Sequence, residues 1–181
     1  SNLRLEMRAE LKRLHQTLGC TIIFVTHDQM EAMTLATSIA VMNNGIIEQL
    51  AKPMDIYRSP SSLFVGKFVG SPPMNVIQIE KGGEIVECLV RATKLAKNKI
   101  KTFGVRPESI CMVPSEKGDI EAIVETIQPT GADWIVGLIV SGKSFFAISS
   151  EQPISDIGQK VGLSFKLDGL HAFDNKDKRI N

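Results

Sequence analysis

The first apolar positions of the chain recur at helical spacing, whereas later segments carry short continuous apolar runs. Five apolar residues near the start show this helical spacing: Leu3, Met7, Leu11, Leu14 and Leu18. It predicts an amphipathic helix over 3–18, with Gly19 as its C-cap. The continuous β-branched and aromatic run over 21–26 predicts a strand that is buried on both faces.

The next forty residues predict a second helix, a hairpin and two short helices. Asp28 and Glu31 resemble a capping box at the start of the second helix. Runs at 38–42 and 46–50 flank Asn43-Asn44-Gly45, which is typical of a hairpin turn. Short helices are expected over residues 53–57 and 63–69.

A break in composition at Gly70-Ser71-Pro72-Pro73 predicts a domain boundary between residues 70 and 71. Short β-rich runs then follow, at 76–80, 85–90, 99–105, 120–127, 134–140, 144–148 and 161–167. Many short strands separated by turn signals favour a small antiparallel sandwich or barrel. The sequence therefore predicts one domain over 1–70 and a second, β-rich domain over 71–181.

Composition and charge narrow the classes of function. A formal net charge of +1 implies no bulk attraction to nucleic acid or to anionic lipid. Cys20, Cys88 and Cys111 form no CxxC pair, so neither a zinc site nor a disulfide framework is expected. We interpret them as buried, reduced thiols, and we expect no metal site.

Residues 21–50, which contain Val25-Thr26-His27-Asp28-Gln29-Met30-Glu31-Ala32, resemble the histidine loop and hairpin of ATP-binding cassette (ABC) transporter ATPases. Residues 51–75 narrow the resemblance to importers of the maltose and glycerol-phosphate type. Three later motifs do the same, at 104–108, 131–134 and 170–174. The resemblance implies an α/β remnant of the ABC ATPase core in 1–70. For 71–181 it implies an all-β, oligonucleotide/oligosaccharide-binding-like barrel with a regulatory role.

The resemblance assigns one catalytic and ATP-binding residue, His27. In this family the corresponding histidine contacts the γ-phosphate of ATP and helps to hold the attacking water. The family's Walker A loop, glutamine loop, signature and Walker B strand are missing from this sequence. We therefore expect a C-terminal fragment, inactive alone, of an ATPase that uses ATP and Mg²⁺. Ser1-Asn2-Leu3 resembles the family's D-loop, Ser-Asn-Leu-Asp, but Arg4 stands where its Asp should be. Alternatively, Ser1-Asn2 is an expression scar, which is the interpretation that we favour.

The resemblance also implies partners and a location. The whole ATPase is expected to form a homodimer with a second ATPase subunit and to bind membrane permease subunits. A regulatory protein at the C-terminal domain is a further expected partner, and nucleic acid is not. The expected location is the cytoplasmic face of the cell membrane, where the complex imports a sugar, a polyol or a glycerol phosphate.

One motif matches a nucleotide-binding pattern without the expected structural context. Gly137 to Ser144 fits the Walker A pattern G-x-x-x-x-G-K-S. A true phosphate loop opens a helix whose N-terminus faces the anion. Here the sequence predicts two strands around a tight turn, so we reject it as a nucleotide site.

The sequence is also compatible with other functions. The chain is alternatively a non-enzymatic ligand- or protein-binding regulatory barrel whose first 70 residues are only partly ordered. A nucleic-acid-binding barrel is disfavoured by the balanced charge and the few aromatic residues. Within the barrel, we expect Arg106 and Glu108 to stay solvated or pair locally, Trp134 to pack in a core or interface, and His171 to be hydrogen-bonded.

Overall fold

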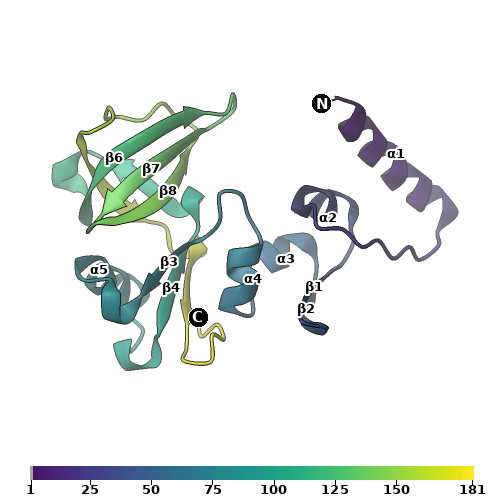
Figure 1. Cartoon of the computed structure of the whole chain (residues 1–181), viewed down its shortest axis with the longest axis horizontal. Helices are drawn as coiled ribbons and strands as arrows, with labels where there is room; N and C mark the ends of the chain where they lie inside the picture. Colours follow the sequence, from purple (N-terminus) through teal and green to yellow (C-terminus); the bar gives the residue numbers. More distant parts are fainter. Residues whose placement is uncertain (1) are drawn as a thin grey trace. The chain divides into compact units, whose positions relative to one another are not determined.

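The computed structural model describes residues 2–181 and divides into two compact units, residues 1–60 and residues 61–181 (Figure 1). The interpretation of Ser1 lies outside the described residues. The second unit begins before residue 71, since it includes helix α4 (Leu63–Phe68). The Arg106 side chain holds this helix by donating a hydrogen bond to the Gly66 carbonyl. The domain boundary between residues 70 and 71 stays a prediction.

The first unit contains the predicted helices and hairpin. Its elements are α1 (Asn2–Leu18), α2 (Gln29–Leu35), β1 (Ile39–Asn43), β2 (Ile46–Ala51) and α3 (Pro53–Arg58). Helix α1 ends where the Gly19 N–H donates to the His15 carbonyl at 3.0 Å, with Gly19 at φ +61°. Asn44 and Gly45 both have positive φ, as the tight turn between β1 and β2 requires.

The strand predicted over 21–26 is wrong, because these residues adopt no regular structure. Ile23 and Val25 are 89% and 91% exposed. A β-strand needs a neighbouring strand for its backbone N–H and C=O groups, and no described residue supplies that ladder to 21–26. The β-propensity of the run is therefore not expressed. Cys20, just before it, is exposed, which corrects the prediction that all three thiols are buried.

The second unit is mainly antiparallel β structure. A five-stranded sheet has the order β5-β9-β6-β7-β8 and a three-stranded sheet the order β10-β4-β3. The strands are β3 (Asn75–Gln78), β4 (Thr102–Val105), β5 (Ile110–Val113), β6 (Ile120–Pro129), β7 (Trp134–Val140), β8 (Lys143–Ser149), β9 (Lys160–Phe165) and β10 (Leu170–Phe173). An α/β segment followed by antiparallel sheets confirms the predicted fold class in outline.

One helix corrects the prediction that this region is all-β. Residues 85–90, expected as a strand, lie in helix α5 (Glu84–Thr93). Ile85, Val86 and Leu89 are fully buried on its inner face. Their spacing has the helical period, and Gly83 and Lys94, both at positive φ, bound the helix. Sequence reasoning also missed strands β5 and β10.

Helix α5 and both sheets share one hydrophobic core. The core-facing residues of β7 are Val136, Leu138 and Val140, which alternate with outward positions as the strand period requires. The side chain of Asn75 joins the two sheets: its Oδ1 accepts from the Phe146 N–H and its Nδ2 donates to the Phe146 carbonyl, each at 2.8 Å. The described part of the chain contains no helix long and apolar enough to cross a membrane.

Candidate functional site

A network of three side chains shapes the loop that carries His27. The Asp28 carboxylate accepts from the Glu31 N–H at 3.1 Å, which confirms Asp28 as the N-cap of α2. The Thr26 hydroxyl accepts from the Asp28 N–H and donates to the Glu31 carboxylate, both at 2.9 Å. Glu31 was expected to close the capping box directly, but Thr26 relays that contact. The relay fixes the backbone on both sides of His27.

Helix α1 braces the same loop. Arg8 Nη2 lies 3.4 Å from Asp28 Oδ2. The Arg8 side chain is only 17% exposed, so this ion pair is screened less than a fully solvated one. Asp28 is therefore held on one oxygen by the backbone of α2 and on the other by α1.

The imidazole of His27 is exposed and makes no hydrogen bond to any other described residue. Both ring nitrogens are therefore available to a ligand or to another protein chain. An imidazole presents a donor and an acceptor when neutral and two donors when protonated. A rigid loop with a free imidazole at its apex can donate a hydrogen bond to an oxyanion.

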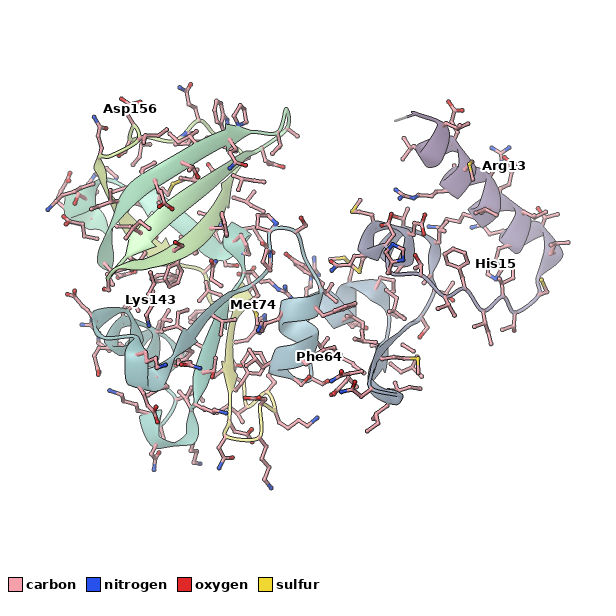
Figure 2. The ribbon with its side chains drawn as sticks, viewed as in Figure 1. Arg13, His15, Phe64, Met74, Lys143 and Asp156 are labelled. Atoms are coloured by element: carbon pink, nitrogen blue, oxygen red, sulfur yellow. The ribbon has the colours of Figure 1, made fainter. Side chains whose placement is uncertain are left out.

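The structure places the other two histidines away from such a role. His15 lies on α1, half-buried, and its carbonyl ends the helix (Figure 2). His171 lies in β10 and is 1% exposed, and neither ring nitrogen has a hydrogen-bond partner in the described structure. The expectation that His171 is hydrogen-bonded is therefore wrong. Burial, together with the positive charges of Arg179 and Arg106, lowers the pKa of His171 to about 4.

The Walker A look-alike is a hairpin. Strands β7 and β8 pair from Trp134–Ser149 to Val140–Lys143, and Ser141 and Gly142 form the turn with positive φ. The ammonium of Lys143, the residue labelled in Figure 2, donates to the carbonyl of Lys81. Gly137 is a paired mid-strand residue, so the segment forms no phosphate-wrapping loop and opens no helix.

Arg106, predicted to stay solvated or to pair locally, is instead buried and bonds to residues that are distant in the sequence. It is 2% exposed, and its Nη1 donates to the carbonyls of Gly66 at 3.0 Å and Val69 at 2.5 Å. These carbonyls belong to the C-terminal end of α4, where a cation is favourable. No local pattern around Arg106 pointed to this role. Trp134 packs against the hydrophobic core, which confirms the prediction for that residue.

Within the described residues, no group of three or more His, Cys, Asp or Glu side chains is arranged to hold a metal ion. Cys88 is buried on α5, and its burial, with a smaller contribution from the charge of Asp119, raises the pKa of its thiol. A raised pKa disfavours the reactive thiolate. Cys88 therefore has a packing role.

Comparison with known proteins shows similarity to one domain family and to import ATP-binding proteins. A family model described as the TOBE domain matches residues 103–173. The sn-glycerol-3-phosphate import ATP-binding protein UgpC 2 of Agrobacterium fabrum is 39% identical over 183 residues, covering 96% of this chain and 49% of its own length. UgpC of Pectobacterium atrosepticum is 39% identical, covering 97% of this chain and 52% of its own length.

A third relative extends the comparison. The putative uncharacterized ABC transporter ATP-binding protein YcjV of Escherichia coli is 34% identical, covering 96% of this chain and 52% of its own length. The chain thus spans about half the length of the curated relatives that it matches, and it matches their C-terminal part. Residues 103–173 form a TOBE domain, and the chain as a whole is homologous to the C-terminal part of ATP-binding subunits of ABC importers.

Proposed function

We propose that this chain acts as the C-terminal half of the ATP-hydrolysing subunit of an ABC importer for a sugar, a polyol or a glycerol phosphate. The observation that carries the proposal is the similarity to import ATP-binding proteins along nearly the whole chain. The exposed His27 in its braced loop lies within the matching region. Two relatives are named for the import of sn-glycerol-3-phosphate, which supports glycerol phosphate as one candidate solute.

His27 is the residue of this chain that we assign to the reaction. Phosphoryl transfer is catalysed mainly by positioning and by stabilising negative charge on the transferred group. The His27 imidazole donates a hydrogen bond to a γ-phosphate oxygen and orients the attacking water. Thr26, Asp28 and Glu31 position the loop without touching the nucleotide, and Arg8 holds Asp28 in place.

This chain alone does not offer a complete site for MgATP. Its Walker A look-alike is a β-hairpin, and no cluster of carboxylates in the described residues is arranged for a metal. ATP and Mg²⁺ are therefore assigned to the whole protein, in which the remaining half supplies the phosphate and metal contacts. Alone, the chain is expected to hydrolyse no ATP and to need no cofactor.

The proposal includes partners and a location. A second ATPase subunit completes the nucleotide site in a homodimer. The homodimer transmits its conformational change to membrane permease subunits. The complex sits on the cytoplasmic face of the cell membrane. A regulatory protein that docks on the TOBE-containing unit is a further proposed partner.

A second candidate function is a non-enzymatic regulatory module formed by residues 61–181. The observation that favours it is that this unit has its own core, built from both sheets and α5. In this reading the unit binds a small ligand or a protein without any contribution from His27. One protein can have both functions. Only ATP hydrolysis requires His27.

The test joins the N-terminal half of UgpC 2 from Agrobacterium fabrum to residues 3–181 of this chain and measures ATP hydrolysis. We expect activity in this chimera and none in residues 3–181 alone. His27→Ala is expected to lower kcat by about 100-fold or more, as removal of a transition-state hydrogen bond does in other enzymes. His15→Ala is the matched control, since it removes an imidazole from the same unit.

Two results would contradict the proposed role of His27. One is full activity in the His27→Ala chimera, and the other is an equal loss in the His15→Ala chimera. A chimera that folds and binds MgATP but hydrolyses none would favour the regulatory module as the function of this chain.

A further inference from the structure

A concentration of positive charge forms where residues 97–101 meet residues 174–179. Their sequences, Lys-Asn-Lys-Ile-Lys and Asp-Asn-Lys-Asp-Lys-Arg, carry six Lys or Arg side chains and two Asp. The two segments therefore hold a net charge of +4, in a chain whose formal net charge is +1. They are adjacent because the Lys101 N–H donates to the Phe173 carbonyl at 2.8 Å. Lys97 pairs with Glu87 of α5, so part of this positive charge is compensated from outside the two segments.

The two segments, together with Ile180, line an open depression of about 350 Å³. Its lining consists of two lysines, two asparagines, two isoleucines and one aspartate: Lys99, Lys101, Asn98, Asn175, Ile100, Ile180 and Asp174. The volume lies at the lower end of the range for small-molecule sites. No aromatic ring lines it, which disfavours the stacking of a nucleobase.

The carboxylates beside the depression are already engaged. Asp174 Oδ1 accepts from the backbone N–H groups of Lys176 at 2.8 Å and Lys178 at 2.9 Å. Asp177 lies 3.5 Å from the Lys101 ammonium. Lys99, by contrast, forms no ion pair within the part of the chain that the structure describes. The depression therefore keeps an uncompensated ammonium on one of its walls.

From this arrangement we infer that the depression binds a small organic phosphate, a phosphate monoester carried on a short hydroxylated carbon skeleton. The uncompensated Lys99 ammonium matches a phosphate as a point charge, and Lys101, which also pairs with Asp177, lies beside it. The amides of Asn98 and Asn175 both donate and accept hydrogen bonds, as hydroxyl groups require. Ile100, 5% exposed, and Ile180 give the carbon skeleton an apolar floor.

Such a site is a regulatory one, because it belongs to the second unit and contains none of the residues assigned to ATP hydrolysis. It deepens the second candidate function, a ligand-binding module formed by residues 61–181, and does not depend on the proposed role in ATP hydrolysis. Binding is measured on the chain without ATP, so failure of this inference leaves the ATPase proposal untouched, and the reverse also holds.

The experiment titrates the full chain with glucose 6-phosphate in an isothermal calorimeter, with glucose and inorganic phosphate in parallel. We expect saturable binding of glucose 6-phosphate, at least about tenfold weaker binding of inorganic phosphate and no binding of glucose. Binding is expected to weaken as salt is added, since both lysines are solvent-accessible. The absence of any saturable signal at millimolar glucose 6-phosphate would overturn the inference, as would equal binding of glucose.

Substitutions of single lysines test whether Lys99 contributes to the binding site. Lys99→Gln is expected to weaken glucose 6-phosphate binding by about tenfold or more, because it removes a charged hydrogen bond. Lys99 is exposed and unpaired in the described structure, so this variant keeps the fold, and Lys99→Arg is expected to retain binding. Lys117→Gln is the matched control, an exposed lysine that does not line the depression. Equal loss in Lys117→Gln, or unchanged affinity in Lys99→Gln, would refute the assignment.

Discussion

The Arg106 guanidinium donates from Nη1 to the Gly66 carbonyl at 3.0 Å, and this bond ties helix α4 to the end of β4. The same Nη1 donates to the Val69 carbonyl. Gly66, Val69 and Arg106 are all buried, so the guanidinium takes the place of water at the two carbonyls. One buried cation thus satisfies two carbonyls at the C-terminal end of a short helix, beside the Val69 N–H that donates to the Val65 carbonyl.

The first prediction follows from this bond. Arg106→Ala is expected to lower the free energy of unfolding of the second unit by about 3 kcal/mol, because it leaves two buried carbonyls unsatisfied. Chemical denaturation followed by the fluorescence of Trp134 measures the effect. The control, Arg91→Ala, removes an exposed arginine from α5 and is expected to change stability by less than about 0.5 kcal/mol. Similar values for the two variants would contradict the capping role.

The second prediction concerns acid stability and His171. Its pKa is about 4 in the folded chain and about 6.5 when unfolded, so the unfolded state binds more protons between these values. Stability from this residue is complete above pH 6.5 and is lost as pH falls toward 4. The total loss is on the order of 3 kcal/mol. Arg179, Arg106 and Asp168 are the charged groups that act on the ring.

Denaturation midpoints at pH 7.5 and pH 4.5 test this in the parent chain and in His171→Leu. Leucine loses no hydrogen bond here, because neither ring nitrogen has a partner in the described structure. The variant is therefore expected to lose less stability on acidification than the parent chain. Glu121 also titrates in acid, since hydrogen bonds from Lys160 and Ser115 lower its pKa, but it is present in both proteins and its effect cancels. An equal acid loss in both proteins would rule out His171 as the source.

Local pattern predicted the elements whose stabilising contacts are near in sequence. Helix α1, the β1–β2 hairpin and the β7–β8 hairpin all follow from spacing and turn residues within a few positions. The Walker A match was rejected on the same local grounds. The loop of His27 was likewise predictable in outline, because Asp28 and Glu31 cap α2 from within the loop.

The features that escaped prediction depend on distant partners. Arg106 bonds to residues 40 and 37 positions away, so nothing beside it in the sequence signals burial. The segment over 85–90 has apolar residues that suit either a strand or a helix, and its packing against both sheets decides for the helix. The strand predicted over 21–26 does not form because a distant partner is missing. Its residues favour a strand, but no neighbouring strand in the described residues pairs with them.

The third prediction concerns close packing between two strands. A Cβ added to Gly137 on β7 would lie 2.4 Å from the Thr126 hydroxyl on β6, which is well inside contact distance. Gly137→Ala is therefore expected to destabilise the second unit by about 1–3 kcal/mol. In a Thr126→Ala background the same change is expected to cost less, because the clashing oxygen is gone. A double-mutant cycle measured by denaturation checks this, and additive effects would refute the contact as the cause.

The fourth prediction concerns the Walker A look-alike. Calorimetric titration of the chain with MgATP is expected to show no tight binding, and Lys143→Ala is expected to leave the result unchanged. The reason is that Lys143 follows a two-residue hairpin turn and its ammonium donates to the Lys81 carbonyl. Tight binding that Lys143→Ala abolishes would mean that the hairpin assignment of residues 134–149 is wrong.

The fifth prediction concerns self-association through residues 21–26. The run is rich in β-forming residues, its backbone is paired with no other described strand, and Ile23 and Val25 are almost fully exposed. Such an unpaired edge favours pairing with the same segment of a second copy. Light scattering is therefore expected to show concentration-dependent association of the chain. Ile23→Lys with Val25→Lys is expected to reduce it, because charged side chains protect exposed edges.

The control for this experiment is Leu3→Lys with Leu5→Lys, which adds the same charge to exposed apolar positions of α1. Pairing through 21–26 predicts that the control associates as the parent chain does. If the control loses association equally, net charge or the apolar face of α1 is the cause instead. A monomeric parent chain whose amides over residues 20–50 resist hydrogen exchange would mean that the segment is already satisfied within one molecule.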